Sequence, residues 1–234
     1  MNIIAKIINK IKLLYYYGND NRMIHYLRKQ GVLIGENVVI RHPMSSRIDL
    51  SRPSLIEIGD NVDINKDFQL LTHDWCSFVF RNVYHDFINS SGKVVIGNNV
   101  YIASNVTILK GITIGDNVII GAHSFVTKSI PSNSVAAGIP CRVICSLDDY
   151  YLKRKKEALE EAKEYVRSIR QRFGREPKLQ EMSEEFIYFV NKNNLADYKD
   201  ILPIQRQLDL GYHDWIENHK SLYDSFDDFL ASIK

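Results

Sequence analysis

The sequence has little cysteine and no excess of charge of either sign. Its 234 residues include only three cysteines, Cys76, Cys141 and Cys145, without the spacing of zinc ligands. This pattern argues against a disulfide framework and favours a reducing cytosol. The 30 Lys and Arg residues stand against 28 Asp and Glu, for a net charge of +2, whereas nucleic-acid-binding domains carry a strong basic excess. We therefore expect no nucleic-acid partner, and any anionic ligand has to be met by local positive charge.

A long hydrophobic run is also missing from the one segment that suggests targeting. In the N-terminal stretch MNIIAKIINKIKLL, apolar residues recur at helical spacing, but Lys6, Lys10 and Lys12 interrupt them. We therefore expect neither a secretory signal nor a membrane span. The pattern predicts an amphipathic helical segment over residues 1–30, which either packs on its own protein or makes peripheral contact with a membrane surface.

A strict six-residue period runs through residues 96–131. The stretch divides into the blocks IGNNVY, IASNVT, ILKGIT, IGDNVI, IGAHSF and VTKSIP, and each block begins with Ile or Val. Neither the helical period of 3.6 nor the strand period of 2 produces this spacing. Short hexapeptide repeats are typical of a parallel β-helix.

The period predicts which side chains stack inside such a β-helix. With about six residues on each of three faces, one coil takes about eighteen residues. Aliphatic residues at the first position of a block should then lie on those one coil later: Ile96 on Ile114, Ile102 on Ile120 and Ile108 on Val126. Each fully buried aliphatic side chain contributes ~1.5–3 kcal/mol. Asn and Gly at the corners tolerate left-handed backbone angles that β-branched residues avoid.

The same phase returns upstream, at residues 34–38 and 58–70, but it loosens between Arg41 and Glu57, where we predict an irregular coil. A loop over residues 73–93 then separates Leu70 from Ile96. Loops of this length inside a compact repeat are more often functional than idle. This loop begins within the sequence LLTHDW, which carries His73.

Helical signals replace the period after Val143. Residues 148–172 are rich in Lys, Arg, Glu and Ala around an apolar stripe. The stretch from Gly174 to Pro177 should end this helix, with shorter helices at 181–191, 196–211 and the C-terminus, the last one capped by Ser225 and Asp228. We therefore predict a mainly β fold, in which a parallel β-helix domain over residues 31–146 lies between the N-terminal helix and a C-terminal α-helical extension over residues 147–234.

These motifs resemble those of a known family. Residues 31–144, and above all IGNNVYIASNVTILKGITIGDNVIIGAHSFVTKSIPSNSVAAGIPCRVI, are similar to the left-handed parallel β-helix acyltransferases, the hexapeptide-repeat family that includes galactoside and maltose O-acetyltransferases and serine acetyltransferase. The resemblance implies a left-handed coil, acetyl-CoA as co-substrate without a catalytic metal, and a saccharide hydroxyl as acceptor. It also implies a homotrimer with active sites between subunits. The setting we expect is the bacterial cytoplasm, either free in it or at the inner face of the membrane.

The resemblance also carries expectations for single residues of the catalytic and acceptor sites. His73 lies where the family has its general base, and a neutral imidazole can take the proton of a hydroxyl at physiological pH. Asp74 is expected to support it, and the acceptor contacts are expected from Trp75, His85 and Arg47. Galactoside-type enzymes carry an asparagine one coil earlier, which this sequence lacks between Val39 and Asp60. Our hypothesis is therefore that Arg47, Asp49 or Arg52 binds a charged sugar or a nucleotide-linked one.

The remaining expectations concern the cofactor and the alternatives. By their position in the repeats, the residues expected to bind acetyl-CoA are Ser104, Ala122, Thr127, Lys128 and Arg142, with His123 at a nearby corner. N-acetylation of a nucleotide-linked amino sugar could use the same base, and a non-catalytic β-helix scaffold stays open. A hydratase of the γ-carbonic-anhydrase type needs three histidines converging on zinc, a pattern that this sequence does not offer.

Overall fold

The computed structural model describes residues 15–234, which divide into two compact units between Tyr151 and Leu152. The predicted amphipathic stretch at residues 1–14 lies outside the described residues. Helix α2 (Asp20–Gln30) confirms a helix further along this N-terminal segment. The Asn19 side chain caps its start by accepting from the Arg22 N–H, and Gly31 ends it with a φ of 100°, a left-handed angle that suits glycine. Within residues 15–234, no helix is long and apolar enough to cross a membrane.

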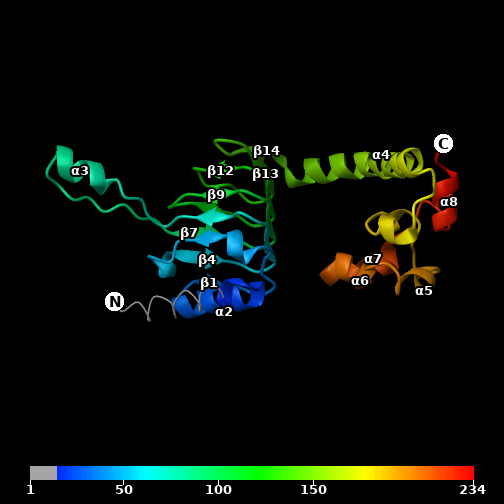
Figure 1. Cartoon of the computed structure of the whole chain (residues 1–234), viewed down its shortest axis with the longest axis horizontal. Coiled ribbons are helices and arrows are strands. Elements are labelled where there is room, and N and C mark those ends of the chain that lie inside the picture. The colour runs from blue at the N-terminus through cyan, green and yellow to red at the C-terminus, as the bar shows by residue number, and fades with distance from the viewer. Residues whose placement is uncertain (1–14) are drawn as a thin grey trace. The chain divides into compact units, whose positions relative to one another are not determined.

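The first unit is a three-faced parallel β-helix, as predicted (Figure 1). Each face is a sheet of short strands that stack coil upon coil. The first sheet has the order β1 (Leu33–Ile34), β4 (Ile56–Ile58), β7 (Val94–Ile96), β10 (Thr113–Ile114). The third has the order β3 (Arg47–Ile48), β6 (Gln69–Leu70), β9 (Thr107–Ile108), β12 (Phe125–Val126).

The second sheet is the longest of the three. Its order is β2 (Val39–Ile40), β5 (Val62–Ile64), β8 (Val100–Ile102), β11 (Val118–Ile120), β13 (Ser134–Ala137), β14 (Arg142–Ser146). The strand β14 runs antiparallel to β13, and the pairing shifts between Val135 and Ala136. This hairpin ends the repeat, and the chain then enters a long helix.

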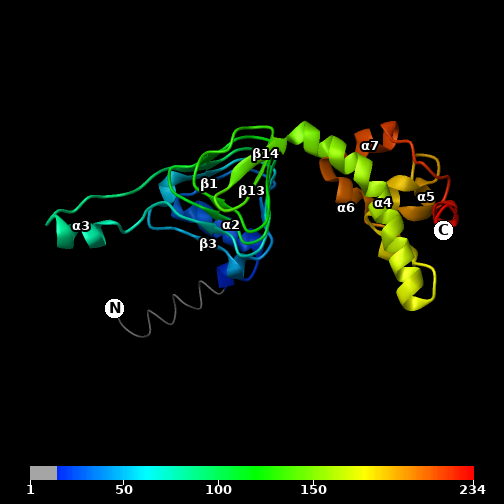
Figure 2. The same ribbon diagram turned by 90° about the horizontal axis from the view of Figure 1, so that it is seen from above.

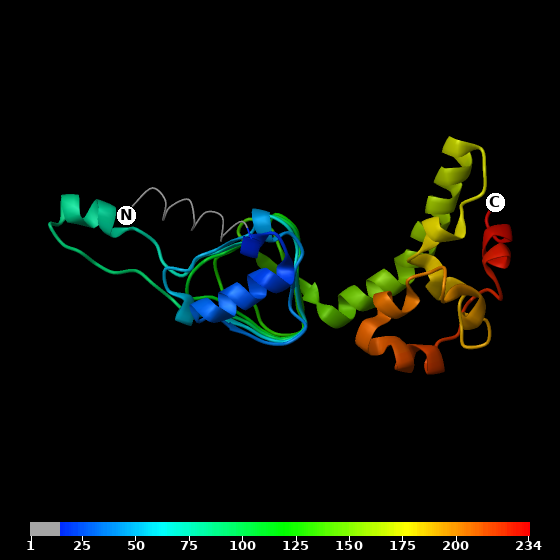
Figure 3. The same ribbon diagram turned by 60° about the horizontal axis from the view of Figure 1, so that its bottom comes forward.

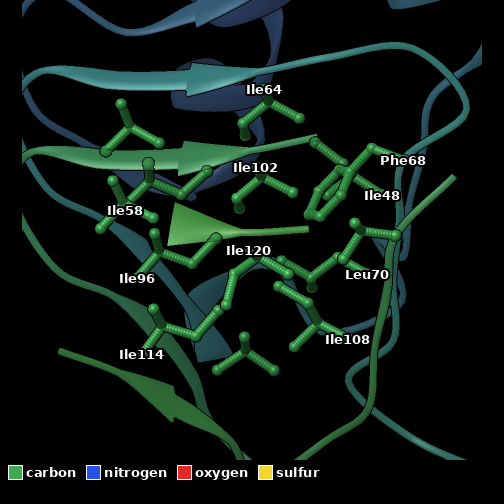
Figure 4. Close-up of a cluster of buried hydrophobic side chains, with 14 of the residues drawn as sticks. Ile48, Ile58, Ile64, Phe68, Leu70, Ile96, Ile102, Ile108, Ile114 and Ile120 are labelled. Carbon is green, nitrogen blue, oxygen red and sulfur yellow. The ribbon is translucent and has the colours of Figure 1, made fainter. Parts of the chain in front are cut away.

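The core of the β-helix follows the six-residue period. The register pairs Ile96 with Ile114 and Ile102 with Ile120. It also pairs Ile108 with Val126, and all of these side chains are buried. Figure 4 shows Ile96 above Ile114 inside the prism, with Ile102 and Ile120 in a neighbouring row. The stacking predicted from the sequence is confirmed.

The corners carry a ladder of asparagines. The φ angles of this ladder lie between 54° and 57°, at Asn37, Asn61, Asn99, Asn117 and Asn133. Each side-chain amide donates to the amide oxygen of the next coil's asparagine, over 2.8–3.0 Å. Asparagine tolerates this left-handed conformation, and the ladder satisfies its polar groups. The corner residues therefore fix both the turn and the alignment of the coils.

The predicted irregular coil is confirmed between β2 and β4. Short 3-10 helices, Pro43–Ser45 and Pro53–Leu55, flank the strand β3 there. Ser46 occupies a core-facing position that is usually apolar, and its side chain is buried. Its hydroxyl donates to the His42 carbonyl oxygen over 3.1 Å. A satisfied hydrogen bond makes this buried polar group tolerable.

Two other segments leave the regular coil. Helix α2 lies across the lower end of the prism (Figure 3), where Met23, Ile24 and Leu27 join the core. The loop over residues 73–93 runs outward from the coils and carries the short helix α3 (Ser77–Val83) at its far end (Figure 2). This helix was not predicted, because about two turns of helix leave no clear periodic signal.

The second unit is helical and has its own core. The helix α4 (Leu147–Phe173) agrees with the predicted 148–172 and contributes Ala162 and Val166 to that core. The predicted helices at 181–191 and 196–211 are instead broken into short pieces: η3 (Leu179–Met182), η4 (Glu185–Tyr188), α5 (Leu195–Tyr198), α6 (Ile204–Leu208) and η5 (Asp209–Gly211). Pro203 interrupts the second of them, since proline cannot donate a helical hydrogen bond.

The chain ends in two further helices, α7 (Tyr212–Asn218) and α8 (Phe226–Ala231). The Ser225 hydroxyl accepts from the Asp228 N–H over 3.1 Å, as the capping spacing predicted. Phe189 and Phe229 are fully buried and their ring centroids lie 5.9 Å apart. Aromatic packing rather than regular helix length therefore holds this unit together.

Candidate functional site

His73 lies at the root of the loop, three residues after β6 ends. It forms an isolated antiparallel bridge with Ser91, and the Gly92 N–H donates to the Thr72 carbonyl oxygen over 3.0 Å. The two ends of the loop are thus joined beside the histidine. About a third of the His73 side chain, 35%, is exposed. The imidazole is fixed by the backbone and still reachable from solvent.

A carboxylate that the sequence did not single out for this role orients the ring. The Nδ1 of His73 lies 2.7 Å from Oδ2 of Asp49 and 3.0 Å from the Ser51 hydroxyl. Asp49 follows β3 by one residue, one coil before His73, and its N–H donates to the Leu70 carbonyl oxygen. The parallel stacking of β3 on β6 therefore brings the pair together, although 24 residues separate them.

Asp49 is held by further donors. Its Oδ2 accepts from the Thr72 hydroxyl over 2.6 Å and from the Thr72 N–H over 3.0 Å, and Oδ1 accepts from the Ser51 N–H. Burial by itself raises the pKa of Asp49, but the hydrogen bonds from Thr72, Ser51 and His73 outweigh it and hold the pKa well below its usual range. A carboxylate that stays ionised requires a proton on Nδ1 of His73, which leaves Nε2 as the basic nitrogen.

Asp74 does not take the supporting part that we expected. Its Oδ1 accepts from the Cys76 N–H over 3.1 Å, and its Oδ2 accepts from the Ser90 hydroxyl over 2.8 Å and lies 3.0 Å from the Lys110 ammonium. Bonds from Cys76, Lys110 and Ser90 hold its pKa well below the usual range. Adjacent residues on extended backbone point to opposite sides, so the carboxylate that contacts the imidazole in this structure is that of Asp49. Asp74 ties the loop root to the next coil, while Asp49 contacts the imidazole.

The candidate acceptor residues lie in different elements, Arg47 on β3 and the other two in the loop over residues 73–93. Trp75 is 58% exposed, and its ring meets Phe87 edge-on at 5.8 Å within the loop. His85 is exposed and has a φ of 53°. Arg47 is exposed on β3, two residues before Asp49 and on the same face of the strand. No hydrogen bond joins these three side chains within residues 15–234.

Arg52 adds a contact between this coil and the loop. Its Nη2 donates to Oδ1 of Asn89 over 3.0 Å, and Asn89 lies two residues before Ser91, the bridge partner of His73. The guanidinium is therefore held beside the loop root without a carboxylate partner among the described ion pairs. From the sequence we considered Arg52 only as a sugar contact. Its hydrogen bond to Asn89 joins residues 37 positions apart, which the repeat pattern does not predict.

The candidate cofactor residues are divided between corners. Thr127 and Lys128 follow β12, which stacks on β9 and β6, so they share the corner of His73. At about 4.8 Å per coil, they lie roughly 10 Å along the axis from it. Ser104 and Ala122 follow β8 and β11 at a different corner, where the His123 N–H donates to the Ser104 carbonyl oxygen over 2.9 Å.

The other two expectations at these corners concern His123 and Arg142. His123 has a φ of 57°, which confirms its predicted place at a corner. Arg142 is exposed on β14, where its Nη1 donates to the neighbouring Cys141 carbonyl oxygen. A single chain therefore does not bring all five predicted cofactor residues to one corner. Within residues 15–234, no group of three or more His, Cys, Asp and Glu side chains is arranged to hold a metal ion.

The geometry defines a class of protein: a hexapeptide β-helix with an oriented histidine at the point where a loop leaves the coil. Residues 93–128 match the family model described as bacterial transferase hexapeptide (six repeats). The chain is 36% identical over 127 residues to protein CapG of Staphylococcus aureus, which covers 54% of this chain and 73% of CapG. These sequence matches show that the chain belongs to the bacterial hexapeptide-repeat transferases. Membership of this family implies that the coil is left-handed.

Two further matches cover different shares of this chain. Galactoside O-acetyltransferase of Escherichia coli strain K12 is 46% identical over 107 residues, which are 42% of this chain and 49% of that protein. This chain therefore spans about half the length of that relative. A solved structure of a maltose O-acetyltransferase from Clostridium difficile 630 is 33% identical with a TM-score of 0.43, and the match covers 58% of this chain and 83% of that one.

Proposed function

We propose that the protein is an acetyl-CoA-dependent O-acetyltransferase that acts on a saccharide hydroxyl, with His73 as general base. The observation that carries this proposal is the 2.7 Å contact between Nδ1 of His73 and Oδ2 of Asp49, which leaves Nε2 as the basic nitrogen at an exposed loop root. Membership of the hexapeptide-repeat transferases and the name of the galactoside relative support acetyl transfer. A saccharide of the cell surface, or its precursor, is the acceptor that we propose.

The proposed reaction follows from this geometry. Nε2 of His73 takes the proton of the acceptor hydroxyl as its oxygen attacks the thioester carbonyl carbon of acetyl-CoA. The new C–O bond forms and the C–S bond then breaks, and the proton passes from the imidazolium to the departing thiolate. Asp49 stabilises the imidazolium and holds the ring in place, so it is a positioning residue. A backbone N–H at the neighbouring corner is the candidate donor to the oxyanion.

The proposal extends to a homotrimer in which each active site lies between two copies. Thr127 and Lys128 share the corner of His73, whereas Ser104 and Ala122 lie at another corner. We propose that the second corner, together with Arg142, comes from the neighbouring copy, so that acetyl-CoA lies between the two. Exposed apolar side chains on the loop, among them Phe78 and Val79, would then be covered by that copy.

A direct test is to incubate the full chain with acetyl-CoA and a panel of saccharides and to follow the release of CoA thiol. We expect release that depends on the saccharide and yields an alkali-labile ester. An alkali-stable product on an amino sugar would instead establish N-acetylation. Absence of any release, together with no thermal stabilisation by CoA, would support the scaffold alternative and contradict the proposal.

Arg47 provides a second prediction, on acceptor choice. If its exposed guanidinium binds the carboxylate of an acidic saccharide, Arg47→Ala should raise the KM for that acceptor roughly tenfold, because a charge-assisted hydrogen bond is lost. The KM for a neutral saccharide should stay the same. Lys29→Ala, which removes an exposed charge at the end of α2, is the matched control. Acetylation of both acidic and neutral glycans that is unchanged in the Arg47 variant would exclude this contact.

A further inference from the structure

The helical C-terminal unit contains a cavity that the proposed reaction does not use. Its volume is about 510 Å³, and it is bounded by α4, by η4 and by the segment that follows α7. Pockets of this size fit small organic ligands. All of the lining residues belong to this unit, so the cavity is formed without the β-helix.

The charges around this cavity have one sign. Lys155, Lys156 and Lys220 line it, and none of the lining residues is Asp or Glu. Among the described ion pairs, Lys156 and Lys220 take part in none. A smaller cavity of about 200 Å³ adjoins it through Ala158, Ile187 and Tyr188 and carries both signs of charge, from Arg154 and from Glu161, Glu184 and Glu185. The larger cavity is therefore the one suited to an anion.

Apolar side chains make up much of the remaining lining, together with the polar Asn218 and His219. Leu159 and Ile187 are partly buried against the core of the unit, and Leu222 is 65% exposed at the edge. His219 forms part of the wall in a fixed orientation, because its Nε2 lies 2.7 Å from the Ile187 carbonyl oxygen and its ring stacks on Trp215 at 3.9 Å. One cavity thus offers an apolar wall and ammonium groups together.

We propose that this cavity binds a small amphiphile that has an alkyl chain and a single anionic head group, a phosphate monoester or a carboxylate. The alkyl chain would lie against Leu159, Ile187 and Leu222 and be removed from water. The head group would lie near Lys156 and Lys220, since an anion needs a charged partner when it leaves bulk water. A purely apolar ligand would leave the lysines unused, and a small inorganic anion would leave the apolar wall exposed.

Calorimetry on the full chain tests this proposal with octyl phosphate, used below its critical micelle concentration. We expect saturable binding of octyl phosphate, weaker binding of octanol and weaker binding of inorganic phosphate. Octanoate in a parallel titration distinguishes the two head groups. In a Trp75→Phe background, the remaining Trp215 should report the same binding by a change in fluorescence, because it stacks on His219.

Matched variants separate the two halves of the cavity. Lys156→Gln and Lys220→Gln should each weaken octyl phosphate roughly threefold to tenfold. Lys153→Gln, on the same helix but away from the cavity, should leave the affinity unchanged. Leu222→Ser should weaken octyl phosphate but not inorganic phosphate, with the exposed Leu210→Ser as its control. Octanol or inorganic phosphate binding as tightly as octyl phosphate, or equal affinities in the lysine variants and Lys153→Gln, would overturn the proposal.

Discussion

Replacing His73 by alanine is expected to lower kcat for acetyl transfer by roughly 10²- to 10⁴-fold, the usual contribution of a general base. The reason is that a saccharide hydroxyl is a poor nucleophile unless its proton is removed as the new bond forms. The KM for acetyl-CoA should change little, because the predicted cofactor residues lie elsewhere on the coils. The measurement is the steady-state release of CoA thiol, with acceptor and acetyl-CoA varied separately.

The control for this variant is His25→Ala. His25 is exposed on α2, in the same unit and away from the loop root. Its removal should leave the turnover unchanged, and both variants should melt near the temperature of the unsubstituted protein. A His73→Ala protein that keeps full activity would refute the assignment of His73 as the base. It would not contradict the assignment of acetyl-transfer activity.

The second large effect is expected for Asp49→Asn. This change keeps the size of the side chain but removes the charge that holds Nδ1 of His73 protonated, so the imidazole can adopt the wrong tautomer. We expect kcat to fall about 10- to 10⁴-fold, as for the aspartate of a Ser-His-Asp site, with a nearly constant KM for acetyl-CoA. Asp63→Asn is the matched control, because Asp63 pairs with Arg41 on the second sheet and does not contact His73.

The shifted pKa of Asp49 predicts how the free energy of unfolding should change with pH. The pKa of Asp49 is depressed in the folded protein, and an unfolded aspartate has a pKa of about 4. Its contribution to the free energy of unfolding is thus present above about pH 4 and is lost as the pH falls toward the folded value. The difference in melting temperature between the unsubstituted protein and Asp49→Asn should accordingly shrink in acid. A constant difference down to pH 3 would mean that the charge of Asp49 does not matter for stability.

Much of the β-helix could be predicted from the sequence because one rule repeats. Each block begins with an aliphatic residue. Because the period is fixed, the residue that stacks on it one coil later can be named from the sequence, as for Ile102 and Ile120. The helical unit follows no such rule. Its core depends on contacts between segments far apart in the sequence, such as Phe189 with Phe229, and local patterns do not report them. The predicted helices at 181–191 and 196–211 were accordingly too long.

The candidate site was predictable only in part for the same reason. The position of His73 follows from the period, because the repeat shows where the loop departs. Its partner does not, because Asp49 lies in the one coil where the period loosens, and the sequence offers Asp74 as the nearer carboxylate. The stacking of β3 on β6 decides between the two, and it becomes visible only when the register of that coil is known.

Helix α2 has a consequence for how the molecule behaves in a crowded solution. The strands β1, β2 and β3 each stand first in their sheets, so every sheet ends in backbone groups that could pair with another chain. A β-helix left open at this end would present a template for end-to-end growth into a fibre. By laying Met23, Ile24 and Leu27 across the first coil, α2 turns a potentially endless repeat into a finite one.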